Sequence, residues 1–338
     1  MWSLLCLLFF VPFVQARITD FKSDARYNAT YLKNDVISHV AHLFPSINAD
    51  VMSHTTQAEQ YQLKPIRATL ALVSQRHTPF FSWMDAKYAL SINRLNQCAH
   101  DQIQAFTCLD CDDMKLKFVY SPPSGKDTRV LIVATETFLM VGFQGPSRDI
   151  PAWLADLNTQ QTEFPCVRCL VNRDFYHPFT ELVDPVVDAI TELHELNPLL
   201  PIYLSGHSVG AALATLFAVH VNIHSPSLPI THVFTFGSPR VGNKAFALFA
   251  NKMLGERWFR VMNQLDIVAS VPPQSFGYHH TGQLMLCNTG TTICLIKGRN
   301  EENEGGAQED LLRLTESTKH IQACHFTYWK ETLECTSR

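Results

Sequence analysis

The second half of the chain alternates short apolar runs with longer stretches of helical spacing. Residues 201–205, 232–236 and 258–262 are short and rich in β-branched or aromatic side chains, which is typical of buried strands. Residues 209–221 and 244–253 lie between these runs and have the length and composition of helices. This βαβαβ order predicts an α/β fold with a mostly parallel central sheet and helices on both faces.

The pattern of apolar and polar residues changes at Asp85. Residues 17–84 are mixed and polar and have no sustained period, which favours an N-terminal extension or prosegment. We therefore expect the folded domain to span residues 85–338. Its first half contains three predicted strands, at 116–120, 129–134 and 137–143, and a helix with apolar positions Leu182, Val186, Ile190 and Leu193.

The amino terminus has the pattern of a secretory signal peptide. Residues 2–14 are almost wholly apolar but too few to span a bilayer, and the small Ala16 precedes Arg17. Residues 1–16 are therefore predicted to be removed. An uncleaved anchor is the alternative, because only the α-amino group supplies positive charge before the apolar run. We expect a secreted protein with no integral membrane segment after cleavage and with Asn28 as a glycosylation acceptor.

Composition narrows the classes of partner. Hydrophobic residues make up 46% of the 338 residues and charged residues 17%, which argues against intrinsic disorder. The formal net charge of -4 offers no general electrostatic footprint for nucleic acid or for anionic membrane. We therefore expect no nucleic-acid partner, and a lipid partner must be met by apolar surface.

The ten cysteines agree with an oxidising compartment, and nine remain once Cys6 leaves with the signal peptide. Two C-x-x-C motifs, at 108–111 and 166–169, raise the alternative of a zinc site. Fifty-four residues separate them, against roughly 15 to 20 between paired zinc knuckles. Four upstream histidines also lack a metal-binding pattern, so no metal is expected: His39, His42, His54 and His77.

The strongest chemical signal is Gly206-His207-Ser208-Val209-Gly210, a G-x-S-x-G motif between a predicted strand and a predicted helix. In that position the glycines remove side chains that would clash in a strained turn, which holds the serine hydroxyl out of the sheet. Ser208 is thus a candidate nucleophile. The alternative is a serine that merely caps the following helix.

A serine nucleophile needs a histidine base and an acid to orient it, in the chain order Ser, Asp, His. Asp266 fits the acid because it follows the predicted strand 258–262, at the sheet edge where open α/β sheets build their sites. Spacing does not choose the base among four downstream histidines: His279, His280, His320 and His325.

Three blocks of sequence together resemble the fungal-type lipases, lipase class 3. They are residues 204–214, 235–242 and 260–273, in the right order, and the similarity covers about residues 85–338. The resemblance implies an α/β-hydrolase fold, hydrolysis of acylglycerols or related esters at a lipid–water interface, and no cofactor. It matches Ser208 to the nucleophile, Asp266 to the acid and His325 to the base, whereas His280 matches a position that is not catalytic.

A lid is implied after the third strand. The stretch 150–157 mixes apolar residues with few charges and fits a helix that covers the serine in water, although an ordinary amphipathic core helix is the alternative. The apolar positions of this candidate lid are Ile150, Trp153, Leu154 and Leu157.

The sequence departs from the family at two positions. In an oxyanion hole of this kind Val209 supplies one backbone N–H, but Pro146 occupies the family position of the second donor and has no N–H to give. Ser147, the next residue, is the candidate substitute. Asn172 stands where members often carry His, so we expect a different local turn there.

The family pattern also implies disulfides. It pairs Cys98 with Cys335, Cys108 with Cys111 and Cys287 with Cys294, and Cys166 with Cys169 then becomes the fourth pair. Cys324 is left unpaired, as a small buried hydrophobe.

Two functions of different classes follow. The leading hypothesis is a secreted serine ester hydrolase that cleaves triacylglycerol-type lipid esters through a Ser-Asp-His triad and an acyl-enzyme. The alternative is a non-catalytic or weakly active lipid-binding relative of the fold, which the proline in the oxyanion turn favours.

Overall fold

The computed structural model describes residues 81–106, 113–124, 128–145, 150–263, 266–287, 294–297, 325–329 and 331–335. Several predicted features lie outside this part of the chain: the signal peptide, the extension up to residue 80, Asn28, Cys108, Cys111, Pro146, Ser147, His320 and Cys324.

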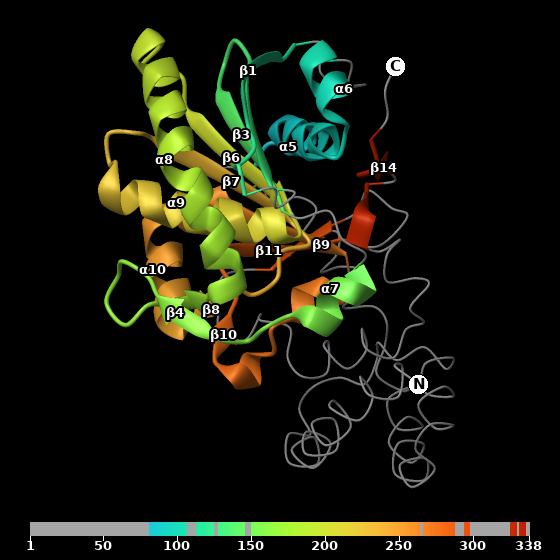
Figure 1. The fold of residues 1–338 in the computed structure, drawn as a ribbon, viewed down its shortest axis with the longest axis vertical. Coiled ribbons are helices and arrows are strands. Elements are labelled where there is room, and N and C mark those ends of the chain that lie inside the picture. The colour runs from blue at the N-terminus through green and yellow to red at the C-terminus, as the bar shows by residue number, and fades with distance from the viewer. Residues whose placement is uncertain are drawn as a thin grey trace, which may run out of the picture. The chain divides into compact units, whose positions relative to one another are not determined.

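A central sheet organises the described residues (Figure 1). Its order is β1 (Lys115–Tyr120), β2 (Arg129–Ala134), β3 (Leu139–Gln144), β6 (Ile202–His207), β7 (Ile230–Phe236), β9 (Trp258–Asn263), β11 (Gln283–Cys287) and β12 (Cys294–Lys297). The strands from β3 to β11 run parallel, and the pairs β1–β2, β2–β3 and β11–β12 at the two edges are antiparallel. The predicted mostly parallel sheet is confirmed.

Helices cover both faces of this sheet, as predicted (Figure 1). On one face lie α8 (Arg173–Leu196), α9 (Val209–His224) and α10 (Lys244–Leu254), and on the other lie α5 (Trp83–Asn96) and α6 (His100–Ala105). Side chains alternate between the two layers along each strand. In β2, Val130 and Ile132 face the first core, whereas Leu131 and Val133 face the second.

Smaller elements complete the described structure. A second sheet has the order β10 (Tyr278–His279), β8 (Gly242–Asn243), β5 (Leu170–Asn172) and β4 (Gln161–Glu163). The others are α7 (Ile150–Asp156), the short helices η2 (Gly255–Arg257), η3 (Val268–Ser270) and η4 (Gln274–Phe276), and the hairpin of β13 (Thr327–Tyr328) and β14 (Glu331–Thr332).

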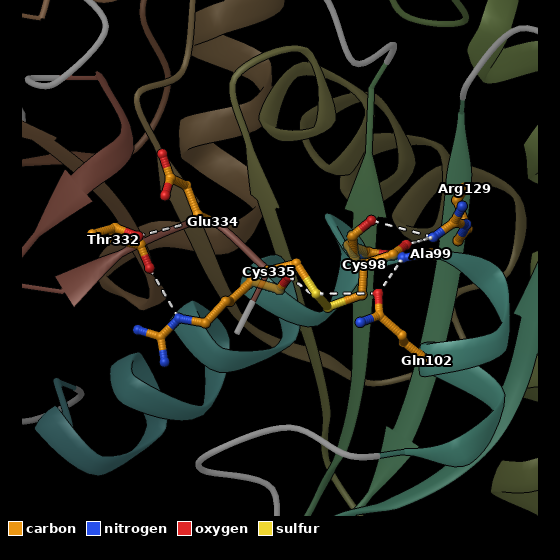
Figure 2. The surroundings of a disulfide bond; sticks show 9 residues. Cys98, Ala99, Gln102, Arg129, Thr332, Glu334 and Cys335 are labelled. Atoms are coloured by element: carbon orange, nitrogen blue, oxygen red, sulfur yellow. Dashed lines mark hydrogen bonds between the residues drawn. A yellow bond between two sulfur atoms is a disulfide. The ribbon is translucent and has the colours of Figure 1, made fainter. Parts of the chain in front are cut away.

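Helix α5 anchors the C-terminal segment. Cys98, just after the helix, forms a disulfide with Cys335 (Figure 2). Arg94 adds a hydrogen bond from Nε to the carbonyl oxygen of Thr332 at 2.9 Å and an ion pair with Glu331 at 2.7 Å. Residues far apart in the sequence are thus held together beside the sheet.

The described residues contain two more disulfides, Cys166–Cys169 and Cys287–Cys294. Together with Cys98–Cys335 they match three of the four pairs expected from the sequence. Within the same part of the chain, no helix combines the length and apolarity that crossing a bilayer requires.

Candidate active site

Ser208 occupies a strained turn between β6 and α9. Its φ is 56° and its ψ is -125°, a conformation that costs a non-glycine residue about 1 to 3 kcal/mol. The two flanking glycines are sterically required. A Cβ at Gly206 would lie 2.2 Å from the carbonyl oxygen of Gly210, and a Cβ at Gly210 would lie 2.1 Å from that of Phe143. The G-x-S-x-G pattern therefore has a direct structural cause.

The Ser208 side chain does not cap helix α9. Ser208 is the N-cap residue of α9, yet its side chain accepts no capping hydrogen bond. Its backbone N–H donates to the carbonyl oxygen of Phe236 at 3.0 Å, and the residue stays partly exposed. The geometry disfavours the capping alternative and leaves the hydroxyl available for chemistry.

Asp266 and His325 form a fully buried pair. His325 Nδ1 lies 2.9 Å from both carboxylate oxygens of Asp266, although the two residues are 59 positions apart. The Asp266 Oδ1 atom also accepts the backbone N–H of Val268 at 3.0 Å. A carboxylate held in this way keeps the proton of neutral His325 on Nδ1, so Nε2 keeps its lone pair.

The Nε2 atom of His325 is buried and has no hydrogen-bond partner among the described residues. A buried polar atom of this kind is costly unless a substrate, a water or a nearby hydroxyl uses it. An unpaired imidazole nitrogen is what a general base requires before it accepts a proton.

Gly237, which follows β7, makes room for this pair. Its φ is +53°, and a Cβ there would lie 2.7 Å from Asp266 Oδ2, 2.7 Å from His325 Cε1 and 2.6 Å from the Tyr328 hydroxyl. A side chain at position 237 would therefore displace the acid or the base. The carboxyl ends of β6, β7 and β9 thus supply Ser208, Gly237 and Asp266 to one site.

The turn after β3 lies against the first residues of α9. A Cβ at Gly145 would lie 2.4 Å from Val209 Cβ and 2.9 Å from the Gly210 nitrogen. Val209 is the first residue of α9, so its N–H has no partner within the helix. The absence of a side chain at Gly145 therefore lets this turn pack closely against Val209 and Gly210.

Helix α7 is packed against the protein. Ile150 and Trp153 are buried, and Leu154 and Leu157 pack on the core cluster that also contains Val209. The Trp153 ring stacks on that of Phe175, with centroids 6.5 Å apart. The apolar side of the candidate lid therefore faces inward, an arrangement that a closed lid and a core helix share.

Asn172 explains the second sequence departure. It ends β5 and caps α8, with Oδ1 accepting the backbone N–H groups of Asp174 and Phe175 at 2.8 and 3.3 Å. Its Nδ2 donates to the carbonyl oxygen of Asn158 at 2.7 Å and to the Tyr278 hydroxyl at 3.1 Å. One buried amide thus joins the segment after α7 to the start of α8.

The structure describes three of the four downstream histidines that the sequence left open. His325 contacts Asp266, whereas His280 Nε2 donates to the carbonyl oxygen of Ala269 at 2.8 Å and supports the loop that follows the acid. His279 lies in β10. His207 is a residue that sequence reasoning passed over. Its Nε2 donates to the carbonyl oxygen of His325 at 2.9 Å, and its position inside the G-x-S-x-G motif was the available signal.

Across the described ranges, His, Cys, Asp and Glu side chains form no cluster able to hold a metal ion. The chemistry that the arrangement supports is a proton transfer between a serine hydroxyl and an imidazole that a carboxylate orients.

A family model that matches this chain and two curated proteins that resemble it are all described as lipases. Residues 140–276 match the model of the family described as Lipase (class 3). A lipase of Rhizomucor miehei is 29% identical over 184 residues, which cover 52% of this chain and 50% of the relative. A secreted mono- and diacylglycerol lipase of Malassezia globosa is 23% identical and covers 57% and 61% of the two chains. The chain thus spans about half to three fifths of the length of these curated relatives.

Solved structures show the fold to be that of the α/β-hydrolases. The native propeptide complex of Rhizomucor miehei lipase superimposes with a TM-score of 0.65 at 24% identity and covers 75% of this chain and 82% of that chain. A triacylglycerol lipase whose catalytic centre is described as a serine protease triad gives a TM-score of 0.61 at 22% identity, over 74% and 94%. The predicted α/β-hydrolase fold is confirmed.

Proposed function

We propose, from the match of residues 140–276 to the class 3 lipase model, that the protein is a secreted serine ester hydrolase of this family acting on acylglycerol lipids. The observation that carries the proposal is the buried Asp266–His325 pair. The Nε2 atom of His325 has no partner among the described residues, and its backbone is hydrogen-bonded to His207, the residue before Ser208.

In this mechanism Ser208 Oγ attacks the ester carbonyl while His325 Nε2 takes its proton. The ester C–O bond then breaks, and the imidazolium returns the proton to the leaving alcohol. A water molecule repeats the sequence on the acyl-enzyme and releases the fatty acid. Asp266 stabilises the imidazolium through the two contacts to Nδ1 and is not itself protonated.

The tetrahedral intermediates carry an oxyanion that needs donors fixed in advance. Val209 supplies one backbone N–H at the start of α9, and we assign the second to Ser147, because Pro146 has no N–H. Gly145, close to Val209, allows the turn the shift of one residue that this assignment requires.

The substrate class follows from apolar surface and from the relatives. Helix α7 presents Ile150, Trp153, Leu154 and Leu157 to the core, and its opening would expose this apolar surface to a lipid–water interface. Relatives are named as lipases and as mono- and diacylglycerol lipases. We infer that residues 17–84 form an extension to a hydrolase domain of residues 85–338, and that residues 1–16 direct secretion.

The proposal is tested by measuring fatty-acid release from emulsified triacylglycerol, with a soluble short-chain ester in parallel. We expect the wild type to hydrolyse both substrates and to act faster on the emulsion, and Ser208→Ala to hydrolyse neither. A folded wild type that binds the emulsion without releasing fatty acid would instead support the alternative, a non-catalytic lipid-binding relative.

A further inference from the structure

His207 connects the proposed nucleophile to the proposed base. It precedes Ser208 in the chain, and its Nε2 donates to the main-chain carbonyl oxygen of His325 at 2.9 Å. The two imidazole rings lie 4.4 Å apart between centroids, with their planes inclined by 39°. Both residues are buried, and 118 positions separate them, so the contact exists only in the folded site.

We propose that His207 is a positioning residue for ester hydrolysis, which holds the backbone of His325 to the turn that carries Ser208, so that the imidazole can take the proton of the serine hydroxyl. This inference rests on the proposed function. His207 is joined to Ser208 by a peptide bond, and its side chain is joined to the main chain of His325 by a hydrogen bond. A shift of about 1 Å between reacting groups is enough to slow a reaction on the order of 100-fold.

Other contacts of the C-terminal segment hold different groups. Asp266 accepts a hydrogen bond from Nδ1 of His325 and so sets the orientation of the ring. Further along, the Asn263 amide donates to the carbonyl oxygen of Thr327, and the Leu333 N–H donates to that of Phe326 at 2.8 Å. The His207 bond acts on the main chain of the base itself, so it complements the carboxylate, which acts on the side chain.

The surroundings of His207 keep its ring neutral. Burial first, and then the neighbouring His325, hold the pKa of His207 well below its ordinary value. Its ring contacts among the described residues are His325, Phe326 at 5.0 Å and Tyr328 at 6.1 Å, and its backbone neighbours across the sheet are Gln144 and Phe236. None of these neighbours carries a carboxylate, so a second positive charge would not be compensated when His325 becomes protonated.

The test compares two substitutions of the same side chain. His207→Phe keeps a ring of similar size but removes the donor, whereas His207→Gln places an amide N–H near the position of Nε2. We expect His207→Phe to lower kcat on a soluble p-nitrophenyl ester about 10- to 100-fold with KM unchanged, and His207→Gln to recover most of this loss. The rate of Ser208 labelling by a small fluorophosphonate should follow kcat. His220→Phe, a matched change of a partly buried histidine on α9, should leave both rates unchanged.

The outcomes separate this inference from the proposed function. Wild type that is neither labelled nor active refutes both. If the wild type is labelled and active and His207→Phe has the same kcat and labelling rate, the positioning role alone is refuted. A loss of kcat in His207→Gln as large as that in His207→Phe refutes it as well. If His207→Phe does not fold, His207→Asn takes its place. The asparagine amide is one methylene too short to reach the His325 carbonyl oxygen, so this variant should lose activity. Activity of His207→Asn equal to that of His207→Gln would refute the positioning role.

Discussion

At the scale of single residues, the site depends on which histidine has an unpaired nitrogen. His325 has its Nδ1 on Asp266 and an unpartnered Nε2, whereas the Nε2 of His280 is used by the carbonyl oxygen of Ala269. The arrangement at His325 leaves Nε2 able to accept a proton, whereas His280 uses its Nε2 to hold the loop that follows Asp266. The two histidines therefore differ in role although both are buried.

We expect His325→Gln to lower ester turnover by several orders of magnitude, because the members of a triad act as a unit. His280→Gln keeps a side-chain donor for Ala269 and should lower turnover far less. Steady-state kinetics on a soluble ester would measure both. Equal losses in the two variants would contradict the assignment of His325 as the base.

His207 also makes stability depend on pH. Its pKa is held well below the ordinary value in the folded state, mainly by burial, and it returns to about 6.5 in the unfolded chain. Below this pH the imidazole of His207 binds a proton in the unfolded state but not in the folded state. The free energy of unfolding therefore falls as the pH is lowered.

We predict that this single group contributes a slope of about 1 kcal/mol per pH unit just below pH 6. Urea unfolding between pH 7.5 and 5 would measure the slope, and His207→Gln should flatten it. His220, whose pKa is also lowered by burial, provides the comparison variant His220→Gln, with a smaller effect because this histidine is only partly buried. An unchanged slope in His207→Gln would show that the group titrates in the folded protein as it does in the unfolded one.

At the scale of elements, Asn172 determines where α8 begins. The helix starts at Arg173 and continues through Pro178 and Pro185, whereas apolar spacing in the sequence indicates a helix only around 182–193. The Asn172 side chain supplies the cap, and its amide group also holds Asn158 after α7. A single buried side chain thus fixes two segment ends.

Asn172→Ala should lower the free energy of unfolding by about 2 to 4 kcal/mol, since it removes a helix cap and two further hydrogen bonds, to the carbonyl oxygen of Asn158 and to the hydroxyl of the buried Tyr278. Denaturant unfolding would measure the loss. The matched change Asn222→Ala removes one hydrogen bond to the Ala218 carbonyl oxygen on the more exposed side of α9, and should cost less than about 1 kcal/mol. A loss at Asn172 no larger than that at Asn222 would contradict the linking role.

Sequence patterns recover the elements that have strong periods. The strand predicted at 129–134 has the bounds of β2, and the predicted helices at 209–221 and 244–253 match α9 and α10 closely. Helix α5 was not predicted, because its buried side includes the polar residues Asn93, Arg94 and Asn96, which weaken the apolar period. Strands of two or three residues, such as β8 and β10, are too short to have a period at all.

The site is recovered unevenly for a related reason. Ser208 and Asp266 follow strands, so a local pattern together with the order of strands places both at one edge of the sheet. His325 does not directly follow a predicted strand, and spacing leaves it among four histidines until the family resemblance selects it. The bond from His207 to His325 joins residues 118 positions apart, and no local pattern encodes such a contact.

At the scale of the whole molecule, the Cys98–Cys335 disulfide joins the start of the described fold to its end, across 237 positions (Figure 2). It closes a loop that includes the whole central sheet and fixes the segment that carries His325. In the chain-entropy model a loop of this length is worth about 5 kcal/mol.

We expect the double variant Cys98→Ser/Cys335→Ser to lose about 5 kcal/mol of unfolding free energy and to lose ester turnover before it unfolds, because His325 is then tethered only by its weaker contacts. The double variant Cys166→Ser/Cys169→Ser removes a disulfide that closes a loop of only four residues and should lose only about 2 kcal/mol. Thermal unfolding and kinetics over the same temperature range would measure both. Similar losses in the two variants would argue against the tethering role.

The central claim is that Ser208 is a nucleophile that His325 and Asp266 activate. Its most direct test is the reaction of the folded protein with a fluorophosphonate, followed by intact mass and peptide mapping. The account predicts one covalent adduct on Ser208, no adduct in Ser208→Ala and a strongly slowed reaction in His325→Gln. A folded wild type that forms no adduct, or an adduct that persists in Ser208→Ala, would contradict it.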